Sequence, residues 1–169
     1  DGSQEVWLDS HQQRVARLRQ ASRMCATQHS VGYCGSHLIT GGLGALGIQT
    51  AISLLQNGAI GVILASRSGR SRREEQHRLA QLLATHGTCR HFAMACDVSD
   101  GTELLSLCGL AGKSPFQGVL HASGTLVDRL MATATYDSAK AVFAPKAVAA
   151  FHLCQATSAQ PLSTCLFFS

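Results

Sequence analysis

From residue 35 onward, short apolar runs alternate with longer amphipathic stretches. His37–Thr40 predicts a short strand, and the continuous apolar run Ile60–Ala65 is typical of a strand buried on both faces. Two further strands are predicted at His91–Cys96 and Gly118–His121, and another begins at Cys165. Strands buried on both faces occur in parallel sheets that helices cover.

Helices are predicted between these strands. Ala45–Gln56 reads as a helix that Asn57-Gly58 ends. The other helices are predicted at 73–85, around 101–110, and as an Ala-rich helix at 138–157, where Pro145 predicts either a kink or the true helix start. The five-fold alternation of strand and helix predicts an α/β fold, a doubly wound parallel sheet of Rossmann-like type.

Residues 1–34 are polar and weakly periodic, with one short edge strand predicted at Arg14–Leu18. The chain has no initiator Met and ends within an apolar run at Phe167–Ser169. We therefore expect a piece of a longer protein, in which the C-terminal part of the α/β domain is missing.

Composition excludes several classes of protein. Hydrophobic residues make up 46% of the chain and charged residues 14%, so disorder is excluded as the main state. No apolar run approaches the roughly 18 residues of a membrane span. The net charge of +4 comes mostly from arginines, but no aromatic side chains are interleaved with them, which argues against nucleic-acid binding.

The seven cysteines are odd in number and form no Cys-x-x-Cys pair, so neither a disulfide framework nor a standard zinc site is indicated. Cys25, His29, Cys34 and His37 match no common metal-ligand spacing. The sequence predicts free thiols, no metal and a cytoplasmic location.

The first candidate site is the glycine-rich string between the first strand and the first helix. Glycines there let the backbone turn sharply and approach a dinucleotide pyrophosphate, which rests on the helix N-terminus. A tight turn that needs glycine for backbone reasons alone is the alternative. The candidate cofactor-binding residues in this loop are Thr40, Gly41, Gly42, Leu43, Gly44, Leu46 and Gly47.

The second strand ends at Ser66-Arg67-Ser68, with Arg67 lying 20 residues after Gly47. An NAD site would place Asp or Glu there to hold the ribose hydroxyl groups. Arg67 can instead pair with a 2′-phosphate, with Ser66 and Ser68 donating further hydrogen bonds, so NADP(H) is predicted. The alternative is a solvated arginine opening a basic helix, a description that fits Arg72 and Arg73 better.

The next two strand ends leave alternatives open. Asp97-Val98 is placed to meet an adenine ring, and the spacing supports equally well the alternative that Asp97 or Ser99 caps the next helix. His121-Ala122-Ser123-Gly124 puts small residues where a cofactor would pass, but small residues there also serve packing. His121 itself is expected to be a core histidine rather than a base.

Lys146, one of three lysines, follows Ala144-Pro145 in an otherwise apolar helix. Near a cofactor it would hold the nicotinamide ribose and lower the pKa of a neighbouring phenol. The alternative is a surface lysine whose stem packs on apolar groups. Neither Tyr33 nor Tyr136 begins a Tyr-x-x-x-Lys pattern.

Taken together in order, these motifs resemble the ketoreductase domain of modular polyketide synthases and of animal fatty acid synthase, in the short-chain dehydrogenase/reductase superfamily. The motifs are 40–47, 66–69, 97–98, 121–124 and 144–146, and the resemblance covers 35–169. It implies a ketoreductase domain at 35–169, with 1–34 forming a linker and the end of a preceding structural subdomain. It also implies NADPH-dependent reduction of a β-ketoacyl thioester on an acyl carrier protein, among neighbouring synthase domains.

The resemblance assigns the 2′-phosphate contact to Arg67, the adenine contact to Asp97 and the role of catalytic lysine to Lys146. The catalytic serine, tyrosine and asparagine of the family would lie after Ser169, so this piece by itself is expected to be inactive. Family members of one stereochemical class carry Leu-Asp-Asp where this chain has Leu126-Val127-Asp128, which makes Asp128 a candidate for stereocontrol. A noncatalytic scaffold domain that has kept its cofactor site is the alternative function.

Overall fold

The computed structural model describes residues 6–9, 12–15, 33–85, 90–110 and 115–168. The chain divides into two compact units, Asp1–Val31 and Gly32–Ser169. In the first unit, β1 (Val6–Asp9) and β2 (Gln12–Val15) form an antiparallel pair. The strand predicted at 14–18 therefore shares only its first two residues with β2, and 16–18 lie outside the described residues.

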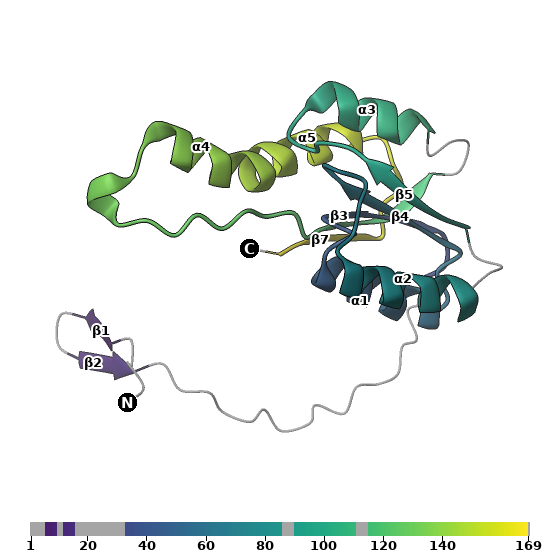
Figure 1. Ribbon diagram of the computed structural model, residues 1–169, viewed down its shortest axis with the longest axis horizontal. Coiled ribbons are helices and arrows are strands. Elements are labelled where there is room, and N and C mark those ends of the chain that lie inside the picture. Colours follow the sequence, from purple (N-terminus) through teal and green to yellow (C-terminus); the bar gives the residue numbers. More distant parts are fainter. Residues whose placement is uncertain (1–5, 10–11, 16–32, 86–89, 111–114, 169) are drawn as a thin grey trace. The chain divides into compact units, whose positions relative to one another are not determined.

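The second unit is built on a five-stranded sheet whose neighbouring strands are all parallel (Figure 1). In sheet order the strands are β5 (Arg90–Ala95), β4 (Gly61–Ser66), β3 (Ser36–Thr40), β6 (Phe116–His121) and β7 (Thr164–Phe167). The chain runs outward from β3 to β5 and then returns to the other side of β3 with β6. The predicted doubly wound α/β fold is confirmed, and its order reverses between β3 and β6, where such folds bind ligands.

Seven helical segments are described in this unit. They are α1 (Ala45–Gln56), α2 (Arg73–Thr85), α3 (Gly101–Leu110), η1 (Met131–Thr133), α4 (Tyr136–Phe143), η2 (Ala144–Val148) and α5 (Ala149–Ala156). The predicted bounds of α1 and α2 are confirmed. Asn57 ends α1, and Gly58 takes the positive φ of +97° that lets the chain turn towards β4.

Alternate strand side chains enter two separate apolar cores. Leu38 packs in one core with Leu104 of α3 and Leu153 of α5, whereas Ile39 packs in the other with Leu54 of α1. Figure 1 shows α1 and α2 below the sheet and α3 and α5 above it. Because successive side chains of a strand point to opposite faces, a strand covered on both sides is apolar throughout.

The long C-terminal helix contains a π-turn at the proline. α4 begins two residues before the predicted start because Thr135 and Ser138 form a reciprocal capping box. Pro145 has no N–H group, and its ring crowds the carbonyl group four residues earlier. The helix widens into the π-helical segment η2 and continues as α5, so a helix start at Pro145 is excluded.

Within the described ranges, no helix combines the length and apolar character that crossing a membrane requires.

His37 is a buried histidine at the start of β3. Its ring is 1% exposed, lies edge-on to Tyr33 with 6.0 Å between ring centroids, and has no hydrogen-bond partner among the described residues. Burial lowers the pKa of His37, and the backbone of Gly35 opposes this in part. The folded chain therefore binds a proton at this ring less readily than the unfolded chain does.

We predict that this site makes the free energy of unfolding fall on acidification. Since the unfolded histidine protonates near pH 6.5, stability declines as the pH falls from about 6.5 towards the lowered pKa of the folded ring. His37→Leu should reduce this decline, whereas His77→Leu, on the exposed surface of α2, should leave it as in the wild type. Urea unfolding at a series of pH values measures how the free energy of unfolding depends on pH. The same dependence in His37→Leu as in the wild type would refute the assignment of this effect to His37.

Candidate functional site

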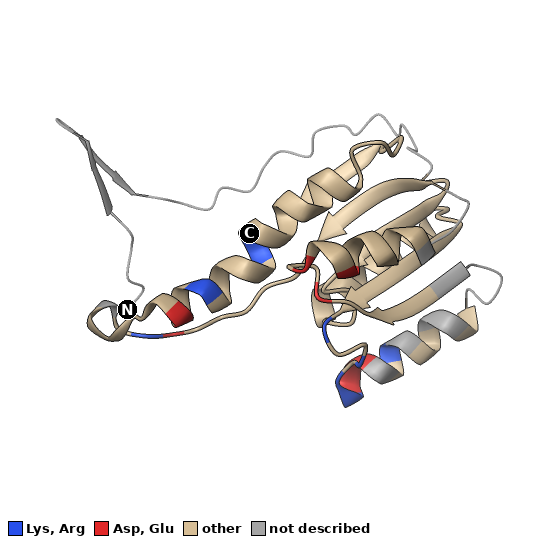
Figure 2. Ribbon diagram, turned by 90° about the horizontal axis from the view of Figure 1, so that it is seen from above, with Lys and Arg blue, Asp and Glu red and all other residues tan. Residues whose placement is uncertain are grey.

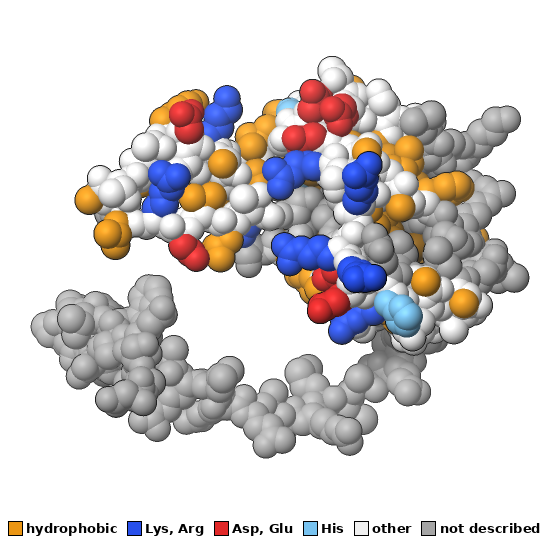
Figure 3. Space-filling view, viewed as in Figure 1, with side chains coloured by type: hydrophobic (Ala, Val, Ile, Leu, Met, Phe, Trp, Pro, Cys, Tyr) orange, Lys and Arg blue, Asp and Glu red, His pale blue; other side chains and the backbone are white. Residues whose placement is uncertain are grey.

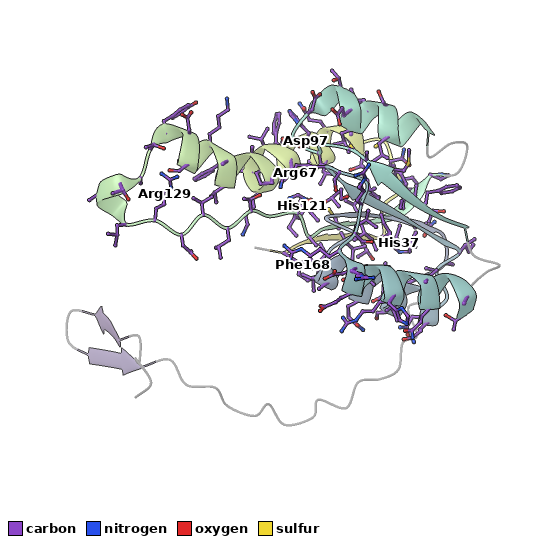
Figure 4. The ribbon with its side chains drawn as sticks, in the orientation of Figure 1. His37, Arg67, Asp97, His121, Arg129 and Phe168 are labelled. Atoms are coloured by element: carbon purple, nitrogen blue, oxygen red, sulfur yellow. The ribbon has the colours of Figure 1, made fainter. Side chains whose placement is uncertain are left out.

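A cleft of about 750 Å³ lies at the carboxyl edge of the sheet. Loops that follow β3, β4, β5 and β6 form it, together with the start of α2 and one residue of η2. Figure 4 shows Arg67, Asp97 and His121 grouped at this edge, with Arg129 out along the segment that leads to α4. The lining residues are Gly41, Leu43, Gly44, Ala45, Ser66, Arg67, Ser68, Arg70, Arg72, Glu75, Cys96, Asp97, Val98, Ala122, Ser123, Gly124 and Pro145.

Most of the residues predicted from the sequence meet in this lining, and seven do not. Those outside it are Thr40, Gly42, Leu46, Gly47, His121, Lys146 and Asp128. Thr40 and His121 are buried beneath the cleft, where the Thr40 Oγ1 atom lies 2.6 Å from His121 Nδ1. Leu46 points away from the core and is 49% exposed.

The glycine turn after β3 is packed so closely that side chains are excluded from it. Gly41 has a φ of +66°, and a Cβ atom there would lie 2.6 Å from the Ala122 carbonyl oxygen. A Cβ atom on Gly47 would lie 2.5 Å from Gly42 Cα. Backbone packing therefore demands these glycines, as the alternative interpretation held, while Gly41 and Gly44 also face the cleft.

The same turn leaves the N-terminus of α1 open at the cleft. Gly44 is the N-cap residue and has no side chain to cap the helix, and the first turn carries no acid. Because the first N–H groups of a helix have no partners within it, this end favours a bound anion. The glycine turn and the helix end thus offer backbone donors to a phosphate.

Arg67 follows β4 and reaches across the edge of the sheet. Its Nη2 atom donates to Thr125 Oγ1 over a long distance of 3.4 Å. Ser66 precedes it with a hydroxyl oxygen that is buried and has no partner in the described part of the chain. Both residues line the cleft, so a cationic fork and an unused hydroxyl group lie side by side there.

Sequence reasoning missed three charged residues of this lining. Arg70, Arg72 and Glu75 come from the loop before α2 and its first turn. The sequence favours a solvated position for Arg72 and Arg73, because a cluster of arginines gives no sign of which of them turn inward. Figure 2 shows basic and acidic residues together at the start of α2, and Figure 3 shows basic side chains gathered on this face.

The structure separates the two interpretations of Asp97. Its Oδ1 atom accepts from the Ser99 backbone N–H at 3.0 Å and from the Ser99 hydroxyl at 2.6 Å, which closes a local turn. Asp100 is the residue that caps α3, accepting from the backbone of Thr102 and Glu103. Hydrogen bonds from the Thr102 hydroxyl and from these N–H groups lower the pKa of Asp100. Asp97 therefore faces the cleft without capping α3.

Lys146 lies on the π-turn, between Pro145 and the loop after β6, both of which contribute to the cleft lining. Its neighbour Pro145 is buried and lines the cleft, while Lys146 is itself exposed. A Cβ atom on Gly124 would lie 3.4 Å from Lys146 Cε, so the lysine stem passes over the loop after β6. Asp128 is exposed further along that segment. Among the described residues, no three His, Cys, Asp or Glu side chains gather as metal ligands, and Cys25 and His29 lie outside them.

The family model described as the KR domain matches residues 35–169. The chain belongs to the KR domain family. It is thus a ketoreductase domain of the polyketide synthase type, in the short-chain dehydrogenase/reductase superfamily, as the sequence motifs suggested.

The curated relatives are very long proteins. A highly reducing polyketide synthase of Aspergillus terreus is 34% identical over 119 residues, which cover 70% of this chain and 5% of that protein. A 6-methylsalicylic acid synthase of Arthrobotrys oligospora is 36% identical over 172 residues, which cover 92% of this chain and 10% of that protein. The chain thus spans a tenth or less of the length of these relatives.

Solved structures of ketoreductases share the fold. An A-type ketoreductase from a modular polyketide synthase aligns with a TM-score of 0.78 and 29% identity, over 93% of this chain and 33% of that one. The first ketoreductase of the tylosin polyketide synthase aligns with a TM-score of 0.74 and 31% identity, over the same shares of the two chains.

Ketoreductase domains of this family bind a nicotinamide cofactor, and the cleft fits one. Gly41 has no side chain to obstruct the turn, and the N-terminus of α1 faces the cleft. The Ser66 hydroxyl is buried there and has no hydrogen-bond partner in the described part of the chain. A chain of phosphates and hydroxyl groups needs these features of its site.

We predict that Gly47→Ala destabilises the domain by about 1–3 kcal/mol, because the added carbon meets backbone atoms that have no room to move. Gly109→Ala is the matched control: Gly109 lies in α3, and no described residue has an atom within 4 Å of an added Cβ there. That change should stabilise the domain by about 0.5–1 kcal/mol, since alanine is the better helix former. Urea unfolding compares the two, and equal stability of both variants would contradict the close packing of the turn.

Proposed function

We propose that this ketoreductase domain reduces a β-ketoacyl thioester, carried on an acyl carrier protein, to the β-hydroxyacyl thioester with NADPH. The observation that carries this proposal is the cleft, where the glycine turn after β3 and Arg67 after β4 lie in one lining. We take 35–169 as the reductase domain, a division that the span of the family match supports, and 1–34 as a linker and the end of a preceding structural subdomain.

In this proposal the cofactor diphosphate lies on the turn at Gly41 and Gly44 and on the N-terminus of α1. Asp97 and Val98 hold the adenine, and the backbone of Ala122–Gly124 passes beside the nicotinamide end. The positions of all these residues in the cleft lining support the assignment.

Arg67 is assigned the 2′-phosphate of NADPH. Its bond to Thr125 is long and has a neutral acceptor, so a phosphate with two charged oxygens would replace that acceptor readily. Ser66 and Ser68 would add hydroxyl donors. Glu75 is an acid in the same lining as Arg70 and Arg72, and its Oε2 atom is buried with no hydrogen-bond partner among the described residues.

Lys146 is proposed as the catalytic lysine. A lysine ammonium group stabilises a nearby phenolate and so lowers the pKa of the phenol, which prepares it to give up its proton. That phenol would belong to the tyrosine that the family resemblance implies. When bound, NADPH supplies the hydride for the keto carbon. Asp128, exposed on the segment after β6, is the residue we assign to stereocontrol.

The partners in this proposal are an acyl carrier protein with its phosphopantetheine-linked chain and the neighbouring domains of a polyketide synthase. The curated relatives are multidomain enzymes of that class, which supports the assignment. We also propose that the protein works in the cytoplasm, where its cysteines stay reduced.

Arg67→Ala in the complete protein tests the cofactor assignment. Loss of a charged hydrogen-bonded pair is worth about 1.5–3 kcal/mol, so the KM for NADPH should rise roughly 10- to 100-fold while the KM for NADH changes little. Arg129→Ala, an arginine outside the cleft lining, is the control and should match the wild type. The measurement is cofactor oxidation during reduction of a β-ketoacyl thioester.

Two results would contradict parts of this proposal. Equal losses for NADPH and NADH in Arg67→Ala would overturn the 2′-phosphate assignment. NADPH binding without any reduction by the wild type would overturn the proposed catalytic function and favour the noncatalytic scaffold.

A further inference from the structure

The turn that carries Asp97 is closed by hydrogen bonds of its own. The Asp97 carbonyl oxygen accepts from the backbone N–H of Asp100 at 2.8 Å, and its Oδ1 atom accepts from the N–H and hydroxyl groups of Ser99. The turn is also tied to the neighbouring strand, because the Cys96 N–H donates to the Ser66 carbonyl oxygen at 2.9 Å. One polar group of the Asp97 main chain, its N–H, takes no part in these bonds.

The Asp97 N–H group is held by a carboxylate from outside the turn. It donates to Oε2 of Glu103, in the first turn of α3, over 2.7 Å. Bonds from an N–H group to a charged oxygen are shorter and stronger than bonds between neutral groups, and this length belongs to that class. Glu103 therefore fixes the main chain of Asp97 from the helix side.

Capping of α3 does not account for this bond. Glu103 stands three residues after Asp100, the spacing at which a glutamate bonds back to the N–H group of the cap residue. Here the Asp100 N–H is already bonded to the Asp97 carbonyl oxygen, and Glu103 reaches three residues further back. Asp100 caps the helix through its own carboxylate. The bond from Glu103 thus serves the turn rather than the helix.

The same turn is coupled to the loop that carries Arg67. The Ser66 carbonyl oxygen accepts from the Gly69 N–H at 3.2 Å as well as from the Cys96 N–H. A Cβ atom on Gly69 would lie 3.1 Å from Ala95 Cβ, so this loop also packs against the end of β5. The loops after β4 and β5 therefore cannot shift independently of each other.

We propose that Glu103 is a positioning residue for the adenosine end of the cofactor. It is exposed on α3 and lies outside the lining of the cleft, so it acts through Asp97, which is in that lining. Its carboxylate holds the Asp97 turn, and through Ser66 the Arg67 loop, in the place where they bind. The effect on the cofactor rests on the proposed function, whereas the bond from Glu103 to Asp97 does not.

Two substitutions at Glu103 test this role in the complete protein. Glu103→Ala removes the acceptor, whereas Glu103→Gln keeps an amide oxygen that can take the place of Oε2. A turn that is out of place for part of the time binds the cofactor more weakly in proportion. We expect Glu103→Ala to raise the KM for NADPH roughly three- to tenfold, the value of one hydrogen bond, and Glu103→Gln to restore most of the affinity. The kcat should stay unchanged, because β4 and β3 separate this turn from the loop after β6.

Glu74→Ala is the matched control. Glu74 is an exposed acid in the first turn of α2, outside the cleft lining, and its removal should leave the KM for NADPH as in the wild type. If Glu103 acted only through its charge, Glu103→Ala would favour the anionic cofactor and lower the KM. That result would overturn the proposal, as would a Glu103→Gln variant as weak as Glu103→Ala.

Hydrogen–deuterium exchange at the Asp97 amide, without ligand, tests the contact itself. Exchange should be faster in Glu103→Ala than in the wild type and close to the wild-type rate in Glu103→Gln, because only the alanine variant lacks an acceptor. Equal rates in all three proteins would show that Glu103 does not hold this group. Thermal unfolding of both variants checks that folded proteins are compared.

Binding of adenosine 2′,5′-bisphosphate, measured by calorimetry, separates the role of Glu103 from the proposed function. This ligand has the adenine and the 2′-phosphate of NADPH and lacks the nicotinamide. Glu103→Ala should bind it roughly three- to tenfold more weakly than the wild type. Equal binding by the two proteins would overturn the role of Glu103. If the wild type binds the bisphosphate but reduces no β-ketoacyl thioester, the proposed function fails and the role of Glu103 is still decided by this comparison.

Discussion

Burial of the sheet on both faces is the constraint on which the rest of this domain depends. Helices cover both faces of the sheet, so its backbone groups are open to a ligand only where the strands end. The strand order reverses between β3 and β6, and the helices that follow these two strands therefore lie on opposite sides of the sheet, which leaves a crevice at that edge. The loops after four strands therefore converge on one cleft. A dinucleotide spans such an edge because its diphosphate needs backbone donors while its two ends need separate sites.

The apolar core residues and the polar site residues come from different parts of each strand. The strand interiors supply the two apolar cores, and the first polar residues after each strand supply the site. Thr40 and His121, the last residues of β3 and β6, lie between the core and the site. Both are buried, and their side chains are hydrogen-bonded to each other. The π-turn at Pro145 belongs to the helix layer and places the stem of Lys146 beside Gly124, in the loop after β6.

Much of this arrangement was predictable from the sequence because it depends on local patterns. The glycine that follows the end of α1 and the unbroken apolar run of β4 fix those elements without reference to the rest of the chain. The order of motifs at the strand ends likewise indicated which residues converge. Which polar side chains are buried, and which way they point, was harder to predict. Nothing in the sequence around Thr40 shows that its side chain turns inward to a histidine 81 residues away.

The other differences between the sequence predictions and the structure also arise because the outcome depends on the path and packing of the folded chain. Asp97 and Asp100 both stand where a helix cap is expected, and only the path of the turn decides that Asp100 is the cap. Pro145 predicted a disturbance of the helix, but whether the helix breaks or widens depends on the packing of its two halves. Arg72 and Glu75 line the cleft because α2 begins beside it, a matter of helix placement rather than of sequence.

Hydrogen–deuterium exchange of the wild-type chain, with and without NADPH, tests the central claim most directly. If the cleft is the cofactor site, NADPH should slow exchange at the amides of 41–47, 66–70, 97–98 and 122–124, and leave those of α4 unchanged. Protection confined to other segments, or absent from the glycine turn at saturating NADPH, would contradict the account.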